Sequence, residues 1–256
     1  MKHAMILALT IGAAGFLCAQ SPSFNSMRTE YYKNQRTKPA DALKIAQEME
    51  KLPNLTQDQK YAIMDLKLGA AYNMGTPEVC IEVAKEIIAS DAPAKIKAGA
   101  YFLGGIRQGV AGNDEEFLRY MLDGIKIAPD AASKYNLMIY HIAALQKLNR
   151  KEEAIEQGKK CVAFAKEQKN LDWELRAYYT VVSSYPQNER CALLEEALKA
   201  ENVFDHPYAQ HISRTLINSY YRNSPEKAKA LCERVLKESK KVIYSDFKKK
   251  LEELSK

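Results

Sequence analysis

Residues 75–88 read GTPEVCIEVAKEII, which combines a turn residue, a proline at a helix start and an amphipathic helix. Turn-forming residues recur every 37 residues, at Gly75, Gly112, Asn149, Pro186 and Asn223. The same step from Cys80 gives Phe117, Ala154, Cys191 and Ala228. A fixed period between about 20 and 50 residues is the signature of a stacked repeat array. The sequence therefore predicts a repeat architecture in one continuous domain.

Amphipathic helices account for the rest of each repeat. Apolar residues fall at helical spacing, as at Ile81, Ala84, Ile87 and Ile88, and no stretch has the pattern of a strand. We expect an all-α chain with first helices at 94–110, 131–147, 171–185, 206–222 and 241–254. Second helices are expected at 77–90, 114–127, 150–168, 188–200 and 225–239, after two helices at 39–51 and 56–74. The helix at 241–254 has no follower, so it is expected to cap the array.

Small and aromatic residues recur at fixed places in the repeats. The clearest set is Leu68, Gly69, Tyr72, Gly75, Cys80, Ala84 and Ile87. This set resembles the tetratricopeptide repeat, and looser matches extend the resemblance over about residues 39–254. Because the spacing of 37 residues exceeds the usual 34 of that family, the chain is better named tetratricopeptide-like. The fourth repeat departs from the pattern, since Glu195 stands where a compact side chain is expected.

The resemblance implies a right-handed α–α superhelix, or solenoid, of helix-turn-helix repeats. First helices line the concave surface of such a solenoid, which receives a peptide or helix of a partner protein. Placing the repeat phase on each first helix predicts eight groove-facing residues: Asn73, Tyr101, Gln108, Gln146, Arg176, Arg214, Asn218 and Tyr221. The alternative is that some of them are merely exposed or belong to helix contacts. Arg214 and Asn218 are similar to two members of a carboxylate clamp in the family, but the other clamp positions do not match.

The N-terminus has the pattern of an export signal. Lys2 precedes an apolar run from Ala4 to Leu17 that is too short for a membrane span of about 20 residues. We expect a signal peptide at 1–19, a polar linker or short helix at 20–38, and the repeat domain at 39–256. An uncleaved anchor and lipid attachment at Cys18 are the alternatives. The protein is expected to be periplasmic or extracellular, with membrane association only if Cys18 is lipidated.

Composition and charge limit the classes of function. The 256 residues include 46% hydrophobic residues and only 11 Gly and 9 Pro, so the chain can bury a large core. A formal net charge of +6 is modest, and we expect no nucleic-acid partner. Most of the excess lies in the lysine-rich tail from Lys237 onward, which is either a solvated helix face or a docking strip for an acidic partner or anionic surface.

Catalytic and metal-binding patterns are missing from the sequence. No GxSxG, HExxH, P-loop or GxGxxG motif occurs, and His206 and His211 are five apart, so they do not share a helix face. His141 is interpreted as a satisfied core histidine. The four cysteines that follow the signal lie too far apart on parallel helices to pair and are expected to be thiols. We therefore expect no enzyme activity, no cofactor and no metal.

One alternative function remains open. A superhelix could enclose a pocket for a small ligand or a reaction, lined by Tyr178, Tyr179, His211 and Tyr221. The main prediction is a non-enzymatic scaffold that binds a protein or peptide.

Overall fold

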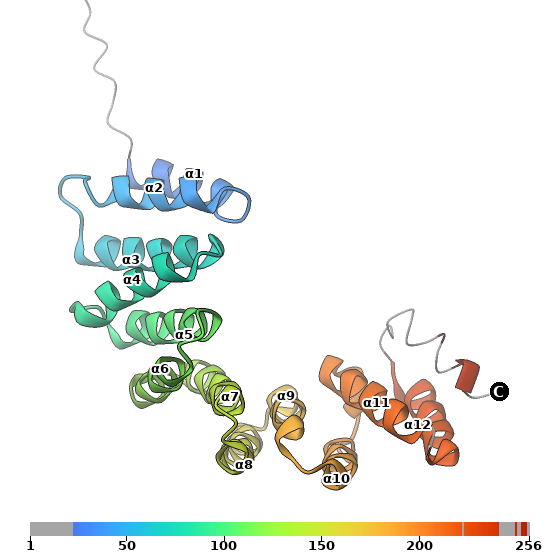
Figure 1. Cartoon of the computed structure of the whole chain (residues 1–256). Coiled ribbons are helices and arrows are strands. Elements are labelled where there is room, and N and C mark those ends of the chain that lie inside the picture. The colour runs from blue at the N-terminus through green and yellow to red at the C-terminus, as the bar shows by residue number, and fades with distance from the viewer. Residues whose placement is uncertain (1–22, 222, 241–248, 250–251, 255–256) are drawn as a thin grey trace, which may run out of the picture.

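The structure is a computed structural model that describes residues 23–221, 223–240, 249 and 252–254 (Figure 1). Those ranges contain helices and no strand. The predicted signal peptide, including Cys18, lies outside the described residues. Most of the predicted capping helix at 241–254 does as well, although 249 and 252–254 are helical and Leu254 packs against the C-terminal part of the core.

Helices follow one another through short turns. They are α1 (Phe24–Asn34), α2 (Pro39–Met49), α3 (Gln57–Asn73), α4 (Pro77–Ala89), α5 (Ala94–Val110), α6 (Asp114–Ile127), α7 (Ala131–Lys147), α8 (Lys151–Glu167), α9 (Leu171–Val181), α10 (Gln187–Ala197), α11 (Pro207–Tyr220) and α12 (Pro225–Glu238). Two short 3-10 helices, η1 (Val182–Ser184) and η2 (Val203–Asp205), flank α10. The bounds of α5, α6 and α7 are those predicted, and α1 occupies part of the predicted 20–38 segment.

Turn and cap residues explain where the helices begin and end. Gly75 and Gly112 have φ values of 79° and 83°, and Asn149, at the same phase, has 56°. This left-handed conformation closes a helix and suits glycine or asparagine. Thr56 begins α3 with a capping box, in which its hydroxyl accepts from the Gln59 amide and the Gln59 side chain accepts from the Thr56 amide. The predicted turns at Gly75, Gly112 and Asn149 therefore coincide with backbone geometry that ends helices, whereas Pro186 and Asn223 lack this left-handed conformation.

Helical pairs are stacked in series along a curved array (Figure 1). Every helix contacts the next one, and α3, α5, α7, α9 and α11 also form a row in which each contacts its neighbour. In the C-terminal half, α7, α9 and α11 lie on the inner side of the curve, whereas α6, α8 and α10 lie on the outer side.

Glycines permit the closest helix contacts. A Cβ added at Gly104 would lie 2.6 Å from Ala84 Cβ, and one added at Gly158 would lie 2.4 Å from Val181 Cγ2. Both distances are far below van der Waals contact, so α5 and α8 approach their neighbours only because a side chain is missing there. Gly104 and Gly158 are therefore close-packing residues.

Polar side chains connect consecutive repeats. The Tyr31 hydroxyl donates to the Leu66 carbonyl, 35 residues along the chain, and the Tyr135 hydroxyl donates to the Trp173 carbonyl, 38 residues along. Arg234 Nη2 donates to the Leu198 carbonyl, 36 residues back. Because a backbone carbonyl has a fixed position, such bonds fix the orientation of each repeat on its neighbour as well as their distance.

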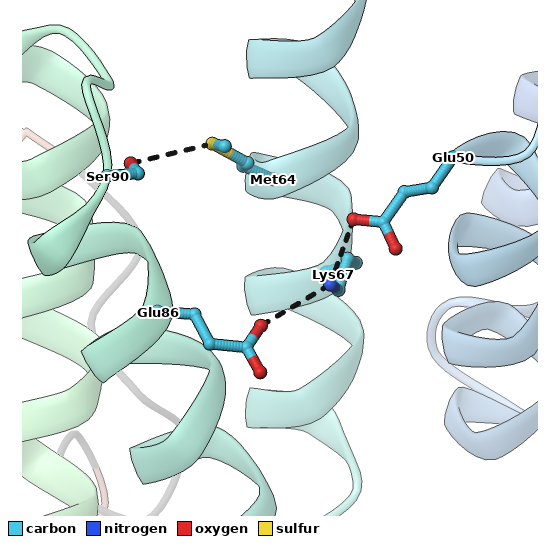
Figure 2. A network of polar contacts seen from close by, with 5 residues as sticks. All are labelled: Glu50, Met64, Lys67, Glu86 and Ser90. Atoms are coloured by element: carbon cyan, nitrogen blue, oxygen red, sulfur yellow. Dashed lines mark hydrogen bonds and ion pairs between the residues drawn. The ribbon is translucent and has the colours of Figure 1, made fainter.

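Lys67 connects three elements in the N-terminal part of the array (Figure 2). Its side chain on α3 is 15% exposed and lies between Glu50, after α2, and Glu86 of α4, at Nζ–oxygen distances of 2.9 and 3.5 Å. Burial alone would lower the pKa of Lys67, but the hydrogen bonds and charges of both glutamates raise it above its ordinary value. On the side of α3 where Glu86 lies, Ser90 Oγ contacts Met64 Sδ at 3.9 Å.

The cysteines of the described chain are thiols, as predicted. Cys80, Cys161 and Cys232 are buried, and Cys191 is partly buried. Burial raises the pKa of Cys80 to about 11 and that of Cys161 to about 12. Buried thiols of this kind are poor nucleophiles at neutral pH.

Candidate binding surface

The inner surface of the array consists of the exposed sides of α5, α7, α9 and α11. An apolar groove lies between α5 and α7 and has a volume of about 650 Å³. We call it the α5–α7 groove, and its lining is Ile106, Gly109, Val110, Phe117, Tyr140, Ala143, Gln146 and Lys147. Val110 is 59% exposed, which is unusual for a valine in a packed helical array. The groove is therefore an accessible apolar surface on the inner row of helices.

Neighbouring contacts hold the walls of this groove. The Tyr140 ring packs edge-on against Phe102 at a centroid distance of 5.0 Å, which joins α7 to α5. Lys147 Nζ donates to the Gly109 carbonyl and lies 2.8 Å from Asp114 Oδ1. Because both ends of the groove are tied across α5 and α7, its shape exists before any partner binds.

A second feature is an aromatic cluster where α9 meets α11. It consists of Tyr179, Tyr208 and His211, whose ring centroids lie 5.8 to 6.3 Å apart. Tyr179 is 39% exposed. The cluster contains two of the four residues predicted for the alternative pocket.

The predicted pocket of Tyr178, Tyr179, His211 and Tyr221 is not formed as one unit. Tyr178 is buried and contributes to a different cavity, of about 340 Å³, between α8, α9 and α10. We call this the Tyr178 cavity, and its other lining residues are Gly158, Lys159, Val162, Ala163, Lys166, Val181, Tyr185, Leu193 and Glu196. The adjacent residues Tyr178 and Tyr179 point to different sides of α9 because consecutive helical residues are about 100° apart.

Three predicted groove residues bind neighbouring protein groups. Asn73 is exposed, and its Nδ2 donates to the Gln35 carbonyl at 3.2 Å. Gln146 lines the α5–α7 groove, and its Nε2 lies 2.8 Å from the Thr180 carbonyl. Arg176 Nη1 donates to Asn136 Oδ1 at 2.9 Å. These side chains connect consecutive repeats in addition to any contact with a partner.

Gln108 was expected to face the groove, but it is only 4% exposed. Its Oε1 accepts from Asn113 Nδ2 at 2.8 Å, so its polar end is satisfied inside the protein. The expectation that Gln108 is accessible in the groove was therefore wrong.

Tyr101 is half-buried and packs edge-on against Tyr120, at a centroid distance of 5.7 Å. Burial, with a contribution from the nearby Asp123 charge, raises the pKa of Tyr101.

The remaining candidates lie on α11 or at its C-cap. Arg214 is half-buried and Asn218 is exposed, both on this helix. Tyr221, the C-cap residue of α11, is 56% exposed.

Repeat phase could have identified two groove residues that the sequence reasoning missed. Asn73 and Tyr221 each lie two residues before a predicted turn, and Val110 and Lys147 occupy the same phase. All four are exposed. Ser184, which lies two residues before the predicted turn at Pro186, is only 5% exposed, so the fourth repeat departs from the others here as well. The shared phase of Asn73 and Tyr221 is therefore the signal that identifies Val110 and Lys147.

His141 differs from its predicted role. Its Nδ1 is buried and has no hydrogen-bond partner, so it is not a satisfied core histidine. Burial, followed by the nearby Arg150 charge, lowers the pKa of His141 to about 4. It lines a cavity of about 330 Å³ together with Glu152, Glu153 and Glu156. Among the described residues, no group of three or more His, Cys, Asp or Glu side chains could hold a metal ion.

Comparisons with known proteins support the fold. No family model matches the sequence, and no curated protein matches it. The crystal structure of the apo form of RapI is similar, with a TM-score of 0.69 and 15% sequence identity, over 89% of this chain and 67% of RapI. At this identity the likeness shows the fold alone. It is consistent with a helical-repeat class for this protein. In the described part of the chain, none of the helices has both the length and the apolar character that a membrane crossing requires.

Proposed function

We propose that this protein is an exported, non-enzymatic scaffold that binds a protein or peptide through its inner surface. The α5–α7 groove is the observation that carries the proposal, because it combines apolar character, accessibility and a position on the inner row. The proposed architecture is a right-handed, tetratricopeptide-like solenoid with a repeat of about 37 residues. The proposed export rests on the N-terminal sequence pattern alone.

The geometry of the groove suits a helix or an extended segment of another protein. Ile106 and Val110 are four residues apart, so they form one apolar ridge along α5. Tyr140 and Ala143 provide the facing wall on α7. An apolar anchor side chain of the partner would lie between these walls and displace water, which is the usual source of affinity in groove recognition.

Val110→Glu tests the proposal, with Leu122→Glu as its matched control. Both replace an exposed apolar residue, 59% and 40% exposed, but Leu122 lies on α6, on the outer side. Each purified variant is used to capture proteins from an envelope extract of the source cell, and captured proteins are quantified by mass spectrometry. We expect one reproducible partner that Leu122→Glu retains and Val110→Glu loses. Equal capture by both variants, or no reproducible partner, would contradict the proposal.

A second candidate function is binding of a small ligand in the Tyr178 cavity. This cavity combines apolar walls from Val162 and Leu193 with polar groups of Tyr178, Lys166 and Glu196. A ligand present at 100 times its dissociation constant would add about 2.7 kcal/mol of stability. We expect Ala163→Phe, an exposed substitution at the cavity, to abolish any thermal shift found in a ligand screen. A shift that persists in this variant would place the ligand elsewhere.

A further inference from the structure

From α4 onward, charge is distributed unequally between the two rows of helices. The inner helices α5, α7 and α11 contain no acidic residue. The helices α4, α6, α8, α10 and α12 each carry three or four. The inner helix α9 has two acids, and both are engaged: Asp172 lies 2.6 Å from His206 Nδ1, and Glu174 lies 3.4 Å from Lys166 Nζ. The inner surface from α5 to α11 therefore has an excess of positive charge.

Two arginines of the inner row are held by neutral groups. Arg107 is half-buried: it donates from Nη2 to the Tyr72 carbonyl and lies over the Tyr72 ring at 4.2 Å, while its Nε is buried and has no hydrogen-bond partner. Arg176 donates to Asn136 Oδ1 and lies 5.9 Å from the centre of the Tyr135 ring. Across the described residues, neither forms an ion pair.

Arginines on the other row differ. Arg119, Arg150 and Arg234 each pair with a glutamate three or four residues away, at or near their own helices. Arg190 of α10 lacks a carboxylate partner, but its three donor nitrogens are all occupied by oxygens of neutral groups, including the Ser183 and Tyr185 carbonyls. These outer arginines thus have compensated charges or satisfied donors, whereas Arg107 has no ion pair and only part of its guanidinium is hydrogen-bonded.

We infer that the segment bound by the inner surface is acidic, with carboxylates that pair with Arg107 and Arg176 on either side of an apolar anchor in the α5–α7 groove. This inference rests on the proposed function and specifies the partner chemistry. A carboxylate matches the geometry of a planar guanidinium, with which it can form two parallel hydrogen bonds. Since α5 contacts α7 and α7 contacts α9, with packed helices 8 to 10 Å apart, the two arginines are separated by about 20 Å. That span corresponds to about six residues of an extended peptide at about 3.3 Å each.

A random library of twelve-residue displayed peptides provides an unbiased probe. The library is selected against the intact protein and against Arg107→Gln, Arg176→Gln and the control Arg119→Gln, which removes an outer arginine. We expect enriched peptides to carry two acidic positions about six residues apart, with an apolar residue between them. Their affinity should fall at least fivefold in each inner variant and stay unchanged in the control. It should also fall as sodium chloride is raised from about 50 to about 300 mM, because salt screens exposed charges.

Val110→Glu separates failure of this inference from failure of the proposed function. Enriched peptides without acidic residues that still require Val110 would overturn the inference and leave the groove as the binding site. Absence of any peptide that prefers the intact protein over Val110→Glu would overturn both. Equal losses in Arg119→Gln and the inner variants would show an effect of net charge only, which also overturns the inference.

Discussion

Gly104→Ala should destabilise the protein, although alanine is the better helix former. The substitution favours the helix by about 1 kcal/mol where the glycine is in open space. At Gly104 the new Cβ would lie 2.6 Å from Ala84 Cβ and 3.1 Å from Tyr120 Cε1. The methyl group of Ala84 has no rotamer that could move it away, so α4 and α5 must separate. Overpacking of this kind costs typically about 1 to 3 kcal/mol.

Gly99→Ala in the same helix is the matched control, because no heavy atom lies within 4 Å of its new Cβ. We expect urea unfolding followed by circular dichroism to show a gain of up to about 1 kcal/mol for Gly99→Ala. The two variants should differ by about 1 to 3 kcal/mol, the overpacking cost at Gly104. At about 2 to 4 °C per kcal/mol for a chain of this size, their melting temperatures should differ by about 2 to 12 °C. Equal stabilities would show that α4 and α5 are not held as closely as described.

Three further predictions concern titration and thiol access. The raised pKa of Lys67 adds stability that is present below pH 10.5 and is lost as the pH rises through the higher pKa of the folded state. Urea midpoints should therefore fall at alkaline pH, and Lys67→Met should reduce that fall. The lowered pKa of His141 gives a pH dependence of the opposite sign. Stability should decline as the pH falls from 6.5 towards 4, because the unfolded chain takes up the proton first. His141→Asn should flatten this decline. Alkylation followed by mass measurement should label Cys191 in the native protein, whereas Cys80 and the other buried cysteines should react only after unfolding; a buried thiol that reacts as fast as Cys191 would contradict its placement.

The fold was largely readable from sequence because turn chemistry and repeat phase agree. Gly75, Gly112 and Asn149 are 37 residues apart and all adopt the left-handed conformation that closes a helix. Pro186 occupies the next phase, but proline disfavours helical backbone in the residue before it. The preceding helix accordingly ends at Val181 and continues only as a short 3-10 turn.

The fourth repeat shows why a pattern of residue types is not sufficient. Glu195 occupies a position where the resemblance required a small side chain. The structure accommodates it through the Tyr220 hydroxyl, which donates to its carboxylate, and through Lys227 at 3.6 Å. Burial, together with this carboxylate, raises the pKa of Tyr220. A polar pair between two repeats thus replaces the close apolar contact, and no single-repeat pattern contains that information.

The binding surface was harder to predict, because the polar side chains of the inner helices also hold the array together. Gln146 and Arg176 were chosen as partner-binding residues, yet both bind groups of a neighbouring repeat. Replacing either one changes the stacking of two repeats as well as the surface that a partner meets. Val110, in contrast, contributes exposed apolar area at the rim of the groove. If Val110→Glu loses partner binding while its unfolding free energy is unchanged, the loss therefore reports on recognition itself. Loss of binding in a Gln146 variant would need a stability measurement before it could be assigned to the partner contact.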